Sequence, residues 1–128
     1  MPLVRIEIVK GHSEEYKKTF LQVIHQALMD TLSIPDSDRY QRLYEIEPEY
    51  FEHSDKSDKF AIIELALFPG RPKELKRNMM KEVIHRLDEA LGLTPDDIFI
   101  IIHEPALDNW GLHGEQASEL QLNYKSAQ

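Results

Sequence analysis

Cysteine is absent from this 128-residue sequence, which excludes disulfide bonds, thiolate metal ligands and cysteine nucleophiles. Long apolar runs are absent as well, since none approaches the roughly 18 residues of a membrane-spanning helix. Arg5 and Glu7 interrupt the apolar stretch near the first residue, so we expect no secretory signal there. These absences favour a cytoplasmic protein that has no membrane partner.

Positive charge is scarce: 15 Lys and Arg residues face 23 Asp and Glu residues, and the net charge is -8. A chain of this sign repels nucleic acids and anionic membranes, so we expect neither as a partner. A small anionic substrate stays compatible with this charge, because a local pair of cations can dominate a pocket. The length and the 41% hydrophobic content predict a single domain, residues 1–128, with one core.

The spacing of apolar residues predicts four strands and two long helices. Val4, Ile6 and Ile8 alternate with other residues, which is typical of a strand. Apolar residues recur at three- and four-residue steps along both helices, which predicts one buried stripe on each. The first helix is expected to begin after Ser13 and the second near Pro72. The strands are expected at about 3–9, 40–46, 60–68 and 98–102, and the helices at about 14–32 and 72–91.

The two halves of the chain look alike, as pseudo-repeats at about 2–50 and 60–104 followed by a C-terminal tail. Each half is expected to form a β-α-β unit with a parallel strand pair, because such crossovers are right-handed and un-knotted. The predicted fold is therefore α+β, with a four-stranded mixed sheet and two helices on one face. The other face would expose much apolar surface, so we expect oligomerisation to bury it.

Pro2 is the first candidate for a functional residue. Removal of Met1 would leave its nitrogen as a secondary amine, which no side chain supplies. The predicted strand follows immediately and would hold that amine in place. Proline is also well tolerated as the first residue of a strand, so this position taken alone favours a purely structural role, and other residues must support a catalytic one.

Asp38, Arg71, Lys73 and Trp110 are further candidates. Arg71 and Lys73 flank the expected start of the second helix, where the helix dipole disfavours cations, and this placement favours binding of an anion. Asp38 is equally compatible with a turn, and Trp110 with simple packing. The six histidines show no pair with metal-ligand spacing backed by a third ligand, so we expect no metal site.

Four short segments, in this order and spacing, carry a family resemblance. They are Met1-Pro2-Leu3, Asp38-Arg39-Tyr40-Gln41, Gly70-Arg71-Pro72-Lys73 and Asp108-Asn109-Trp110-Gly111. With them the chain resembles the tautomerase superfamily from Pro2 to about Glu119. Within that superfamily it is similar to the malonate semialdehyde decarboxylase group and its uncharacterised relatives. The resemblance implies a tautomerase-like fold, a homotrimer with active sites near subunit boundaries, and catalysis without a cofactor.

The resemblance also implies roles for individual residues. Pro2 matches the catalytic proline, Asp38 the acidic residue after the first helix, and Arg71 the first of two arginines. Lys73 stands where the second arginine is expected, and an ammonium lacks the bidentate fork of a guanidinium. Two positions, Trp110 and Leu112, match an apolar pocket wall, and Leu112 stands where the decarboxylase has an aromatic residue.

Two reactions follow from the state of the Pro2 nitrogen. A free α-amine titrates near 8, and an apolar pocket beside Arg71 would lower that pKa and make the amine a general base. We therefore predict a tautomerase that acts on a small 2-oxo or enol carboxylic acid. If Asp38 keeps the amine protonated instead, the chain would be a decarboxylase or hydratase of a 3-oxo acid such as malonate semialdehyde. A ferredoxin-like binding module or an inactive superfamily member are the remaining alternatives.

Overall fold

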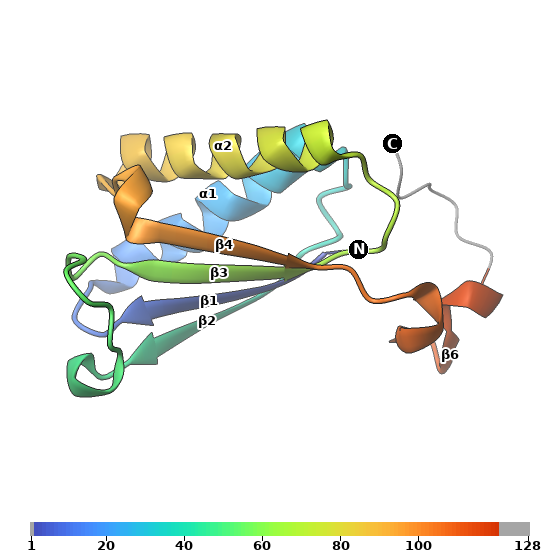
Figure 1. The fold of residues 1–128 in the computed structure, drawn as a ribbon, viewed down its shortest axis with the longest axis horizontal. Helices are drawn as coiled ribbons and strands as arrows, with labels where there is room; N and C mark the ends of the chain where they lie inside the picture. The colour runs from blue at the N-terminus through green and yellow to red at the C-terminus, as the bar shows by residue number, and fades with distance from the viewer. Residues whose placement is uncertain (1, 121–128) are drawn as a thin grey trace.

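The computed structural model describes residues 2–120, so Met1 and residues 121–128 of the predicted domain lie outside the described part. Within that part the chain forms the expected strands and helices in the expected order (Figure 1). The strands are β1 (Leu3–Val9), β2 (Tyr40–Ile46), β3 (Ala61–Ala66) and β4 (Ile98–His103). The helices are α1 (Glu14–Leu32) and α2 (Lys73–Leu91). A short hairpin follows, made of β5 (Gly111–Leu112) and β6 (Glu115–Gln116).

The sheet has the order β2-β1-β3-β4. The pairs β1–β2 and β3–β4 are parallel, while β1 and β3 are antiparallel, which confirms two β-α-β units in one mixed sheet. Leu3 lies opposite Tyr40 on one side and Ala66 on the other, and Ala66 lies opposite His103. The starts of β1 and β2 therefore share one edge with the ends of β3 and β4.

Both helices cover the same face of the sheet and bury their apolar stripes against it (Figure 1). Local signals set their ends. Ser13 caps α1 by accepting a hydrogen bond from the Tyr16 backbone N–H at 3.1 Å. Gly92 ends α2 in a left-handed conformation, with φ of 74°, that glycine adopts without steric cost. Pro72 lies just outside α2, as the residue that precedes its first turn. None of the helices described is long and apolar enough to cross a membrane.

The second face of the sheet is less bare than the strand pattern predicts. Segment 47–60 covers one end, where Phe51 and Phe60 pack on Val9, and segment 104–120 covers the other (Figure 1). Between them lies an exposed strip, whose members are Arg5, Tyr40, Arg42, Tyr44, Glu64, Phe99, Ile101 and His103. Several of these are charged, and His103 Nε2 lies 2.7 Å from Glu64 Oε1.

Large apolar side chains of β4 are exposed on the second face, which agrees with the expectation that the single chain leaves part of this face bare. Ile101 is 46% exposed and Phe99 is 50% exposed on this edge strand, although the Phe60 ring of segment 47–60 packs edge-on against Phe99 with centroids 5.0 Å apart. Exposed aromatic and aliphatic side chains on a strand face are candidates for contact with another chain.

Candidate active site

The topology brings Pro2, Asp38 and Arg71 to one edge of the sheet. Pro2 is buried directly before β1, Asp38 precedes the start of β2, and Arg71 follows the end of β3. Asp38 is held in its turn by a hydrogen bond from its backbone N–H to the Pro35 carbonyl oxygen at 3.0 Å. The sequence spreads these residues over about half the chain, and the parallel and antiparallel pairings place them at the same edge.

Arg71 is buried, with 6% of its surface exposed. The preceding residue, Gly70, has a φ of 120°, a conformation that other residues rarely adopt, and it lets the loop turn sharply before α2. A buried guanidinium is costly unless its surroundings are polar or charged, so such groups concentrate at functional sites and structural ion pairs. Arg71 is therefore a candidate to bind an anionic group at the edge where Pro2 lies.

Trp110 and Leu112 lie at the same end of the molecule, on the sheet face away from the helices. The Trp110 ring packs edge-on against Phe68, and its Nε1 donates a hydrogen bond to the Pro105 carbonyl oxygen at 3.1 Å. Leu112 and Leu3 are partly buried against the same cluster. Because Leu3 is the direct neighbour of Pro2, this apolar cluster lies next to the candidate site.

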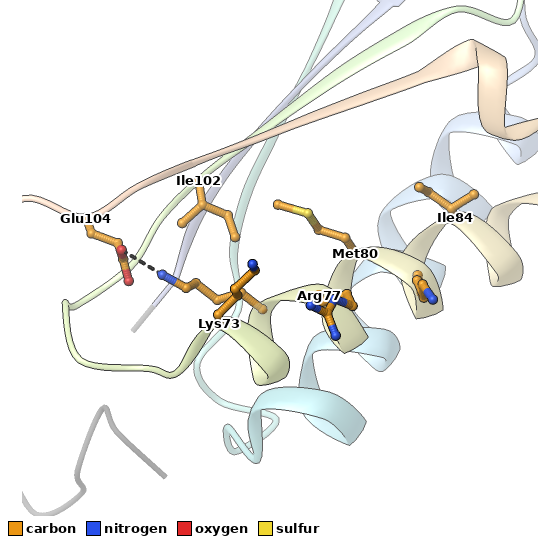
Figure 2. A pocket seen from close by; sticks show the side chains of 8 residues that line it. Lys73, Arg77, Met80, Ile84, Ile102 and Glu104 are labelled. Carbon is orange, nitrogen blue, oxygen red and sulfur yellow. Dashed lines mark hydrogen bonds and ion pairs between the residues drawn. The ribbon is translucent and has the colours of Figure 1, made fainter.

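Lys73 takes a different position. It is the exposed first residue of α2, and its side chain lines a pocket between α2 and β4 on the helix-covered side (Figure 2). Three further cations on this pocket, Lys76, Arg77 and Lys81, are functional candidates that sequence reasoning missed. They follow Lys73 by three, four and eight residues. This spacing places all four cations near one face of a helix, and it is the signal in the sequence that points to them.

Two side chains with shifted pKa values, Tyr16 and Asp97, lie at the opposite end of the sheet, where their role is structural. Burial, with Asp58 and Asp97 nearby, raises the pKa of Tyr16 to about 12. Burial also acts to raise the pKa of Asp97, but hydrogen bonds from Ser57 and Thr94 outweigh it and leave that pKa below its usual range. In the described part of the chain no three His, Asp or Glu side chains are placed to hold a metal ion.

A mixed sheet of two β-α-β units, with Pro2 and a buried arginine at one edge of it, matches the fold that the resemblance to tautomerases implies. The chain belongs to the tautomerase family. A family model described as tautomerase enzyme matches residues 38–113, and a second model with that description matches residues 2–60. The two matches overlap at residues 38–60.

Similar proteins agree with this assignment. The chain is 23% identical to the probable tautomerase YusQ of Bacillus subtilis (strain 168), over 94% of this chain and 100% of that protein. The structure superposes on the FG41 malonate semialdehyde decarboxylase with a TM-score of 0.81 and 28% identity, over 94% and 98% of the two chains. It superposes on a fused 4-OT, described as a wild-type symmetric trimer, with a TM-score of 0.80 and 22% identity, over 91% and 98%.

Proposed function

We propose that this protein is a cofactor-independent tautomerase of a small 2-oxo or enol carboxylic acid, with the Pro2 nitrogen as general base. The observation that carries the proposal is the burial of Pro2 at the start of β1, on the sheet edge that also presents the buried Arg71. The nitrogen becomes a free amine when Met1 is removed. Membership of the tautomerase family supports this use of the residue.

In the proposed reaction the Pro2 nitrogen takes the enol proton, and the resulting enolate receives a proton from the same nitrogen at carbon. Both proton transfers use one group, so the amine returns to its starting state. Arg71 would hold the substrate carboxylate and stabilise the negative charge of the enolate, without Lys73, whose side chain lines the pocket between α2 and β4. Trp110 and Leu112 would form the apolar wall that keeps water away from the amine.

The proposal includes a homotrimer, with each site near a subunit boundary. The exposed strip on the sheet supports it, because Phe99 and Ile101 need cover that the single chain does not supply. The fused 4-OT, which has the same fold and is described as a trimer, also supports a homotrimer for this chain. We also propose a cytoplasmic location, which rests on the absence of cysteine from the sequence.

A decarboxylase or hydratase of a 3-oxo acid is the second candidate. The position of Asp38 at the same sheet edge favours it, because a nearby carboxylate stabilises the protonated amine. The similarity to the FG41 malonate semialdehyde decarboxylase favours it as well. Lys73 argues against it, since the resemblance calls for a second arginine at that position.

The test begins with a mass measurement that establishes whether Met1 has been removed. Processed protein is then assayed with phenylenolpyruvate and with malonate semialdehyde, beside Pro2→Ala and a form that retains Met1. We expect tautomerisation of phenylenolpyruvate by processed protein and strong loss in the retained form. Equal turnover by the processed and retained forms would exclude Pro2 as the base, and turnover of malonate semialdehyde alone would favour the second candidate.

A further inference from the structure

The pocket between α2 and β4 joins an apolar floor to a cationic rim. Met80 and Ile84 extend from the side of α2 that faces β4, and Ile102 points back toward them from the strand (Figure 2). The volume is about 550 Å³, which lies in the range of small-molecule sites. We name it the α2–β4 pocket. Its lining comprises Lys73, Lys76, Arg77, Met80, Lys81, Ile84, Ile102 and Glu104.

Positive charge dominates this pocket although the whole chain carries a net charge of -8. Lys76 is neutralised by Glu104, with Nζ and Oε1 3.0 Å apart. Within residues 2–120, Lys73, Arg77 and Lys81 make no ion pair. Three uncompensated cations therefore surround an apolar floor.

The position of these cations on α2 opposes its dipole. Lys73, Lys76 and Arg77 occupy the first two turns, where partial positive charge already accumulates, and the last turn carries no basic residue. The reverse arrangement would stabilise the helix by a few tenths of a kcal/mol for each charge. A bound anion would relieve this repulsion.

The α2–β4 pocket is separate from the edge where Pro2 lies. The Leu67 backbone N–H donates to the His103 carbonyl oxygen at 2.8 Å, which continues the β3–β4 pairing past the last ladder residues. Extended by one residue, the registers of β1–β3 and β3–β4 put the fully buried Leu67 between Pro2, directly before β1, and Glu104, directly after β4. The Lys76–Glu104 ion pair lies among the residues that line the pocket, at its Glu104 end (Figure 2).

We propose that the α2–β4 pocket binds a carboxylate that carries an apolar chain, at a site distinct from the tautomerase site. The carboxylate would pair with Arg77 and Lys81, and the chain would lie over Met80, Ile84 and Ile102. The lining extends from residue 73 to residue 84, about 16 Å along the helix, which suits an extended alkyl chain. A flexible methionine adapts such a floor to chains of different shape.

The probe is octanoate. It is titrated into the full chain in its native assembly, and binding is followed by NMR of the protein's methyl groups. We expect saturable shifts at the methyl groups of Met80, Ile84 and Ile102. Acetate lacks the chain and octanol lacks the charge, so each should bind at least roughly tenfold more weakly than octanoate.

Substitutions identify the rim. Arg77 and Lys81 are exposed residues of α2. The substitutions Arg77→Gln and Lys81→Gln should each weaken octanoate binding roughly tenfold. Lys18→Gln is the matched control, an exposed lysine on α1 away from the pocket, and should leave the affinity unchanged. Pro2→Ala should also leave it unchanged, so a failure of the tautomerase proposal would not remove this site.

Four outcomes would overturn the proposal. If octanol bound as tightly as octanoate, the cations would not recognise the carboxylate. If acetate bound as tightly as octanoate, the apolar floor would not recognise the alkyl chain. Competition between octanoate and phenylenolpyruvate in turnover would make the pocket part of the substrate site. Contacts between Met80 and protons of another subunit in isotope-filtered NMR would show that a second copy of the chain fills the pocket.

Discussion

The Trp110 ring stands nearly perpendicular to the Phe68 ring, with centroids 4.9 Å apart and an interplanar angle of 78°. Phe68 follows β3, and Trp110 lies far along the chain in segment 104–120. The contact therefore fastens that segment over the start of β1, where Leu3 joins the same cluster. Edge-on aromatic pairs of this kind stabilise a structure beyond their buried area.

Replacement of Trp110 should separate packing from function. Trp110→Ala should lower the free energy of unfolding by about 3–5 kcal/mol, because the ring is 6% exposed and leaves a cavity. Trp110→Phe keeps an aromatic ring but loses the donor to Pro105, so it should lose only about 1 kcal/mol. Urea unfolding measures both. An alanine variant as stable as the parent would mean that the indole contributes to a pocket wall and not to packing.

Asp97 should make stability depend on pH. Its Oδ1 accepts from Ser57 Oγ at 2.8 Å and its Oδ2 from Thr94 Oγ1 at 3.1 Å. Because these bonds leave its pKa lowered in the folded state, the stabilisation is present above the unfolded pKa of about 3.9. It is lost as pH falls through the lower, folded pKa.

Asp97→Ala should therefore lose about 1–3 kcal/mol at pH 7, measured by urea unfolding, and the difference from the parent should shrink in acid. Asp96→Asn is the control, because Asp96 is exposed and its ion pair with Lys56 is worth under about 1 kcal/mol. A difference between parent and Asp97→Ala that is constant from neutral to acid pH would rule out the ionised carboxylate as the stabilising form.

The exposed strip should be the surface that joins subunits. Ile101→Glu places a charge in the middle of that strip and should convert the proposed trimer to monomer in sedimentation equilibrium. Tyr50→Glu is the matched control, since Tyr50 is 78% exposed on the short turn Pro48–Tyr50, outside the strip. A parent protein that sediments as a monomer at micromolar concentration would exclude the trimer.

The regular part of the fold is readable from the sequence, because apolar spacing and end signals agree. Ser13 and Gly92 mark helix boundaries, and the range 40–46 of the second strand matches β2. Segments 47–60 and 104–120 are different, since they lack a period that says which sheet face they cover. Their cover of that face depends on long-range contacts such as Phe51 with Phe60, whose rings lie 5.6 Å apart.

The candidate site, like the fold, is predictable from the sequence only in part. Spacing and resemblance select Pro2, Asp38 and Arg71, and strand order then brings them to one edge. The direction of the Lys73 side chain is not readable from the motif Gly70-Arg71-Pro72-Lys73, because it depends on where the first turn of α2 faces β4. That orientation places it with Arg77 on the α2–β4 pocket.

The charge on the Pro2 nitrogen should decide between the two proposed reactions. Burial and the nearby guanidinium of Arg71 both oppose protonation, so we expect a pKa below the α-amine region near 8. A base is active when it is unprotonated, and turnover of an enol substrate should then rise with pH through that pKa. If Asp38 dominates, the pKa is raised, the protonated amine is the active form, and turnover should fall as pH rises.

Asp38→Asn is the variant that separates these cases. Loss of the carboxylate would lower the pKa of the amine, so it should harm a decarboxylase or hydratase far more than a tautomerase. Pro2→Ala is the companion variant: it leaves a primary amine that is still basic, so it should reduce turnover less than retention of Met1 does, with little change in melting temperature. Titration of the ¹⁵N-labelled Pro2 nitrogen by NMR gives the pKa directly, and a value well above 8 would contradict its role as a base.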